Sequence, residues 1–234
     1  MTSKSTKKQA ATNLSCEFCK RRFSKESTLV THICEPKRRW QDKDKKGNII
    51  GLNAWLQFYT KHGTKKKKDY GDFVKSAYYT AFVKFGNYCA DAGVLQINRY
   101  VDWLLKNQIG IDNWNRDTHY TKFVIDYCKS EDPLDAIARS IETTVILAQD
   151  DKLLTKDVLR FGNRNKICYE ITKGKISPWM LFHSESGMQF IESLDSTQQK
   201  MIFEYINPEQ WALKFNKHKN IIPEIKELLR AGGY

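Results

Sequence analysis

The side chains best suited to chemistry in this sequence are four metal-ligating residues near its start. Cys16 and Cys19 are separated by two residues, and His32 and Cys34 follow a short distance later. Thiolate sulfur and imidazole nitrogen are ligand atoms that Zn²⁺ favours. No secretory signal is recognisable before them, so the six cysteines of the chain indicate free thiols or metal ligands rather than disulfides. We therefore expect a zinc site in this segment.

The spacing of the segment resembles the C2H2 zinc finger. Phe23, Leu29 and His32 complete the pattern C-x2-C-x3-F-x5-L-x2-H, and the resemblance covers residues 14–35. It implies an N-terminal ββα finger whose small core is held together by the metal, because so small a module does not fold without its ion.

The fourth ligand departs from the finger pattern. A C2H2 finger has a second histidine three to five residues after the first, whereas here Cys34 follows His32 by only two. Positions two apart lie about 200° apart on a regular helix, so both side chains can bind one ion only if the helix ends near His32. Pro36 favours such an ending, because the residue before a proline avoids helical geometry. Cys34 is the expected fourth ligand, with His62 or a water molecule as the alternatives.

Basic residues surround the metal-binding segment. The finger resemblance implies that Lys25, Thr28 and Thr31 face the bases of a nucleic acid. Other positions suit contacts with phosphates or stacking on a base: Lys20, Arg21, Arg22, Lys37, Arg38, Arg39, Trp40, Lys65, Lys66, Lys67 and Lys68. We expect low sequence specificity and strong salt dependence, with DNA favoured over RNA. Single fingers also bind proteins, so a protein partner is the alternative.

The positive charge of the chain is concentrated in its first third. The formal net charge is +12; residues 1–75 carry 19 Lys and Arg against 7 Asp and Glu, while residues 76–234 carry 20 against 20. Such a concentration attracts polyanions, nucleic acid above all, and a solubilising arm is the alternative interpretation. No apolar run reaches the roughly 20 residues of a membrane-spanning helix. Together with the missing secretory signal, this predicts a cytoplasmic protein, or a nuclear one in a eukaryotic source.

The periodicity of apolar residues predicts a mainly α fold. Amphipathic helices are expected over residues 48–62, 98–107 and 118–129. An aromatic stripe over residues 70–85 predicts one four-turn helix that Gly86 and Asn87 close. Capping residues predict further helices that begin at Asp132, Asp195, Asn207 and Pro223.

A small β-hairpin is expected over residues 167–182. Two apolar stretches flank Lys173 and Gly174, and Pro178 places the second strand at an edge. The predicted organisation is a flexible basic tail over 1–14, a finger over 15–35, a charged linker over 36–48 and a helical domain over 49–234.

The chain beyond the finger resembles a group of uncharacterised proteins from large tailed bacteriophages, cyanophages among them. The resemblance rests on KRRW after Cys34, the aromatic helix near Trp55–Tyr59 and the stretch DFVKSAYYTAFVKFG. It implies a bacterial host cytoplasm and a role around phage DNA or transcription. It assigns no residue a function.

No catalytic residue is predicted. Asp117 with His119, and His183 with Glu185, are the pairs that a metal-dependent nuclease would use, but Asp and His in turns more often cap helices. Neither a phosphate-binding GxxxxGK[ST] loop nor a GxGxxG motif is present. The sequence therefore predicts a zinc-dependent nucleic-acid-binding protein. A protein-interaction adaptor and a metal-dependent nuclease are the alternatives, and the oligomeric state is not predicted.

Overall fold

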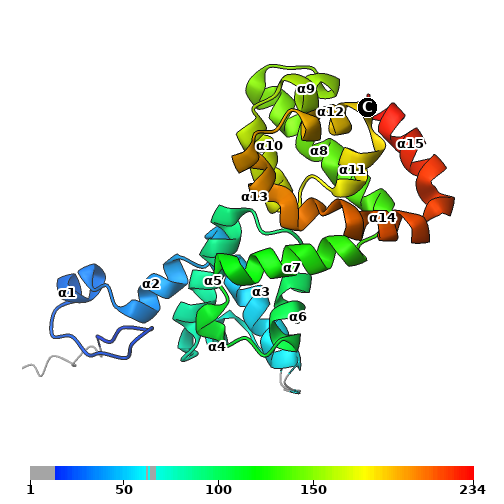
Figure 1. The fold of residues 1–234 in the computed structure, drawn as a ribbon. Helices are drawn as coiled ribbons and strands as arrows, with labels where there is room; N and C mark the ends of the chain where they lie inside the picture. Colours follow the sequence, from blue (N-terminus) through cyan, green and yellow to red (C-terminus); the bar gives the residue numbers. More distant parts are fainter. Residues whose placement is uncertain (1–13, 62, 64–66) are drawn as a thin grey trace, which may run out of the picture. The chain divides into compact units, whose positions relative to one another are not determined.

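The computed structural model describes residues 14–61, 63 and 67–234, and its regular elements there are helices (Figure 1). The chain divides into two compact units, Met1–Asn87 and Tyr88–Tyr234. Within the described residues, no helix combines the length and the apolar character needed to cross a membrane.

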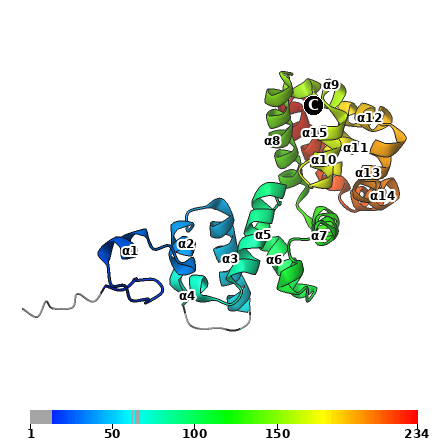
Figure 2. The ribbon, with the colours of Figure 1, turned by 90° about the vertical axis from the view of Figure 1, so that its left-hand side faces the viewer.

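The first unit is built on aromatic side chains. Its helices are α1 (Glu26–Thr31), α2 (Glu35–Gln41), α3 (Lys46–Lys61), α4 (Tyr70–Lys75) and the first part of α5 (Tyr79–Ala92). Trp55 of α3, Phe73 of α4 and Phe82 of α5 are fully buried, and the rings of Trp55 and Phe73 lie 5.4 Å apart. Figure 2 shows α3 beside α5. The two helices approach so closely at Gly51 that a Cβ there would lie 2.6 Å from the carbonyl oxygen of Phe82.

In the second unit, the long helix α8 (Pro133–Asp151) contacts α9, α11 and α15 (Figure 1). The other elements of this unit are α6 (Ile97–Lys106), η1 (Ile111–Asn113), α7 (Asp117–Ser130), η2 (Thr155–Asp157), α9 (Val158–Phe161), α10 (Arg164–Thr172), α11 (Pro178–His183), α12 (Glu185–Glu192), α13 (Ser196–Ile206), α14 (Pro208–Lys217), η3 (Lys219–Ile221) and α15 (Ile222–Ala231). Asp132, Asp195 and Asn207 each accept hydrogen bonds from backbone N–H groups at a helix start, which confirms these three predicted caps.

The predicted ββα finger is wrong. Over the part of the chain that the structure describes there is no β-strand, and before α1 only a single antiparallel bridge joins Ser15 to Arg22. The segment between them is a tight loop. Lys20 has a φ of 61°, and the N–H of Cys16 donates to the carbonyl of Arg21 at 2.9 Å.

The predicted hairpin over residues 167–182 is also wrong, because both segments are helical. Asn163 caps α10 by accepting from two backbone N–H groups, and Gly174, with a φ of 75°, follows the end of that helix. Ser177 caps α11, and Pro178 stands in its first turn, where a missing N–H costs nothing. Pro178, which is expected in an edge strand, thus lies in the first turn of a helix.

The single helix expected over residues 70–85 is divided in two. The hydroxyl oxygen of Ser76 accepts a hydrogen bond from the N–H of Tyr78 at 3.1 Å and from the indole N–H of Trp55 at 3.2 Å. Ser76 has an extended backbone, so α4 ends there and α5 begins as a separate helix at Tyr79. Gly86 does not close a helix. It lies inside α5 at the close approach to Gly47 of α3, and α5 continues to Ala92.

Candidate metal centre

Cys16, Cys19, His32 and Cys34 form a cluster that could hold a metal ion. One ligand atom from each lies within 4.8 Å of the others. The Sγ atoms of Cys16 and Cys34 are 3.8 Å apart, and Cys19 Sγ lies 3.3 Å from His32 Nε2. Cys16 is buried and the other three are half-buried. Among the residues that the structure describes, no other group brings three or more Cys, His, Asp or Glu side chains together in this way.

The first two ligands are positioned by a tight loop. The N–H of Lys20 donates to the carbonyl of Cys16 at 2.9 Å, and the left-handed backbone of Lys20 turns the chain back. The N–H of Phe23 then donates to Leu14 at 2.8 Å and closes the loop at its base. These backbone hydrogen bonds shape the loop that brings Cys16 and Cys19 close together.

The other two ligands meet because α1 is short. The helix ends at Thr31, and His32 has an extended ψ of 120°, which confirms the expected ending near His32. Cys34 is extended as well, at φ −111° and ψ 163°, and precedes α2 with Pro36 in its first turn. The ring centre of Phe23 lies 4.7 Å from the ring centre of His32, so the two rings are in contact. The alternative ligand His62 lies outside the described residues.

The two facing thiols differ in acidity. A hydrogen bond from the backbone N–H of Cys19 lowers the pKa of the Cys16 thiol, while burial raises the pKa of the Cys34 thiol. Cys16 is therefore the readier of these two thiols to become a thiolate, the form that binds a metal.

Most of the side chains predicted to contact nucleic acid are exposed. They are Lys20, Arg21, Arg22, Lys25, Thr28, Thr31, Arg38, Trp40 and Lys67. Lys37 is half-buried and donates to the carbonyl of His32 at 3.2 Å, so it contacts the backbone of the candidate cluster. Lys68 lies 4.5 Å from the ring of Tyr59. Lys65 and Lys66 lie outside the described residues.

Arg39 differs from the other predicted cations because its guanidinium has three partners within the first unit. It donates to the carbonyl of Val74 at 2.6 Å, pairs with Glu35 and lies 4.3 Å from the ring centre of Tyr79. A group so occupied joins α2 to α4 and α5 and is poorly placed to bind a phosphate.

A groove beside the metal centre contains residues that the sequence did not single out. Phe18 and Lys75 line it together with Trp40, Gly71 and Val74. Phe18 stands between two ligand cysteines and is nevertheless exposed, and an aromatic residue at such a position was the available signal. For Lys75 no local signal exists, since only the packing of α4 brings it to the groove.

The pairs considered for a nuclease are not assembled into a centre. Asp117 accepts a hydrogen bond from the hydroxyl of Tyr88 at 2.9 Å. His183 stacks on Trp179, and its Nδ1 lies 3.0 Å from that residue's carbonyl oxygen. Burial lowers the pKa of His183. Neither pair belongs to a metal-ligating cluster within the described chain.

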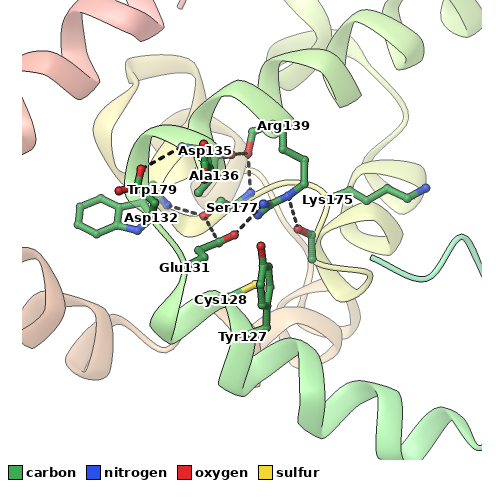
Figure 3. A network of polar contacts seen from close by, with 12 residues as sticks. Tyr127, Cys128, Glu131, Asp132, Asp135, Ala136, Arg139, Lys175, Ser177 and Trp179 are labelled. Atoms are coloured by element: carbon green, nitrogen blue, oxygen red, sulfur yellow. Dashed lines mark hydrogen bonds and ion pairs between the residues drawn. The ribbon is translucent and has the colours of Figure 1, made fainter. Parts of the chain in front are cut away.

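A deeply buried ion pair of the second unit belongs to a network of polar contacts (Figure 3). Glu131, whose side chain is 1 % exposed, lies 2.7 Å from Arg139 of α8, and burial raises the pKa of this carboxyl group. The guanidinium also donates to the carbonyl of Gly174 at 2.9 Å, and the hydroxyl of Ser177 lies 3.5 Å from Glu131. The network ties the segment between α10 and α11 to α8.

Comparison with known proteins adds no relative: no protein family, curated protein or solved structure matches the chain. The likeness to phage proteins therefore stays a prediction, and the function has to be argued from the cluster and its surroundings.

Proposed function

We propose that the first unit is a zinc-stabilised module that binds nucleic acid. The metal is assigned from the donor set and its spacing. Three sulfurs and one imidazole nitrogen suit Zn²⁺ better than hard cations, which take oxygen ligands. A tetrahedral ion with Zn–S bonds of about 2.3 Å separates two sulfurs by about 3.8 Å. That is the separation of the Cys16 and Cys34 sulfurs, 3.8 Å.

The observation that carries the nucleic-acid proposal is a set of exposed cations that lie close in the sequence to the four cluster residues. Lys20, Arg21 and Arg22 follow directly on Cys19, and Arg38 is an exposed residue of α2. No ion pair engages these four side chains within the described residues. Cations held at fixed positions release counterions from a nucleic-acid backbone when they bind it, so the affinity falls steeply with salt.

The test uses full-length zinc-loaded protein and fluorescence anisotropy of a labelled oligonucleotide between 50 and 300 mM salt. The variant replaces Lys20, Arg21 and Arg22 by Gln. The matched control also replaces three cations by Gln, at exposed lysines of the second unit: Lys122, Lys129 and Lys200. We expect the first variant alone to reduce the slope of log affinity against log salt, by about 2 for a single-stranded oligonucleotide and by about 3 for a duplex, as the loss of three phosphate contacts requires. Equal slopes for the two variants would refute the proposal.

A protein partner is the second candidate, and a separate feature favours it. Val30 and Ile33 precede and follow His32 in the sequence, and their exposed fractions are 69 % and 63 %. Apolar side chains held in solvent beside a rigid centre are suited to docking on a protein surface. Stoichiometric zinc without binding to DNA or RNA at any salt concentration would favour this candidate over the first.

A further inference from the structure

An open groove of about 610 Å³ lies against the metal-binding loop within the first unit. Phe18 of that loop and Trp40 of α2 line it, together with Gly71 and Val74 of α4. The two aromatic side chains are 38 % and 39 % exposed, and their ring centres are 6.4 Å apart. The volume lies in the range of about 300–1,000 Å³ that is common for small-ligand sites.

Trp40 is held in place without being covered. Its ring meets Tyr70 edge-on at 5.3 Å between centres, and the hydroxyl of Tyr70 donates to the carbonyl of Arg39 at 2.5 Å. Phe18 is held differently, because it stands between the ligands Cys16 and Cys19. An aromatic pair that is fixed in position and half in solvent loses little entropy when a flat partner stacks on it.

The charged side chains that line the groove determine which kind of flat, aromatic molecule it can bind. Lys20 and Lys75 line the groove, and no described residue forms an ion pair with either of them. Arg39 is already used by Glu35 and Val74, so it forms part of the wall. Two carboxylates also line the groove: Glu35, which is paired with Arg39, and Glu17, which is exposed and unpaired among the described residues. A carboxylate at this place repels phosphate, but it accepts a hydrogen bond from the amino group of cytosine or adenine.

We propose that this groove binds single-stranded nucleic acid, with a base stacked on Trp40 or Phe18 and the neighbouring phosphates at Lys20 and Lys75. The inference rests on the proposed function and narrows it to the unpaired strand. Bases in a duplex are stacked on one another and offer no face to a protein aromatic, whereas every unpaired base does. The groove therefore distinguishes the two forms, while the exposed cations alone do not. Glu17 adds a preference for oligo-dC and oligo-dA over oligo-dT.

The test compares labelled oligo-dC and oligo-dT with a duplex of equal length, on full-length zinc-loaded protein. Trp40→Ala and Phe18→Ala are expected to lower the affinity for oligo-dC by about 5- to 150-fold, the effect of losing one stacked base. Their affinity for the duplex should stay within about twofold of wild type. Val30→Ala is the matched control, since it removes an exposed apolar side chain outside the groove. If Trp40→Ala destabilises the protein, Phe18→Ala still tests the groove, because it removes the other aromatic side chain. The zinc content of each variant is measured in parallel.

The outcomes separate this inference from the function on which it rests. Salt-dependent binding that both aromatic variants leave unchanged, or weaken equally for single strand and duplex, overturns the groove and leaves the basic module standing. Absence of binding to any oligonucleotide at low salt overturns both. A selective loss of single-strand affinity, with oligo-dC bound more tightly than oligo-dT, supports both.

Discussion

Replacing Arg139 by Met tests how the second unit is held together. The substitution leaves Glu131 buried, with a side chain 1 % exposed, and removes the cation at 2.7 Å from it. It also removes the hydrogen bond from the guanidinium to the carbonyl of Gly174. Breaking a buried pair by removing one partner costs about 3–5 kcal/mol, because the remaining charge is uncompensated.

The pH dependence distinguishes this cause from a simple loss of packing. Burial already raises the pKa of Glu131 above its ordinary value, and loss of the neighbouring cation raises it further. A carboxyl group with a raised folded-state pKa supports the fold while it is protonated, and this support is lost as the pH rises through that pKa. The penalty of Arg139→Met should therefore be smaller at pH 5 than at pH 8.

The assay is urea unfolding followed by far-UV circular dichroism at both pH values. With a slope of about 2 kcal/mol per molar urea, the midpoint should fall by about 1.5–2.5 M at pH 8. The control is Arg160→Met, which removes an exposed cation 3.4 Å from Glu185 and should cost less than about 1 kcal/mol. A penalty for Arg139→Met as small as that of the control, or equal at the two pH values, would refute the reasoning.

Three further predictions concern single positions. Cys34→Ser should weaken zinc binding by at least about 100-fold in competition with a chromophoric chelator, whereas Cys168→Ser, at a buried thiol outside the cluster, should not; equal affinities would remove Cys34 from the site. Burial lowers the pKa of His183 from its ordinary 6.5, so the neutral ring supports the fold and this support is lost as the pH falls below that value. The melting temperature of wild type should thus fall more between pH 7.5 and pH 5 than that of His183→Gln, and parallel falls would contradict this. Gly51→Ala should cost about 1–3 kcal/mol in chemical unfolding, because its Cβ would meet the carbonyl of Phe82; an unchanged midpoint would show that the helices can separate at no cost.

Features that depend on nearby residues could be predicted from the sequence. The caps at Asp132 and Asp195 were predictable because a carboxylate accepts from N–H groups two and three residues ahead whatever the rest of the fold does. The helix before Cys34 ends near His32 as expected, but not for the expected reason: Glu35, the residue before Pro36, is itself in α2, and Pro36 stands in the first turn of that helix.

The wrong predictions came from residues whose patterns suit two structures. Pro178 is compatible with an edge strand and with the first turn of a helix, and the buried hydroxyl of Ser177 decides for the helix. Ser76 interrupts the aromatic stripe because its hydroxyl accepts hydrogen bonds from both Tyr78 and Trp55. The bond from Trp55 is a tertiary contact, so the local sequence does not indicate it. The groove at Phe18 needs α2, α4 and the metal-binding loop together, so no single segment indicates it.

The central claim is that zinc holds a nucleic-acid-binding surface in shape. The most direct measurement is the affinity of full-length protein for a labelled oligonucleotide, made across a salt series before and after zinc is removed by a chelator, with metal content determined in parallel. The account predicts one zinc per chain, an affinity that falls linearly with log salt, and a loss of at least about tenfold when zinc is removed and restored when it is returned. Protein that contains no zinc, or an affinity that is unchanged on its removal, would contradict the account.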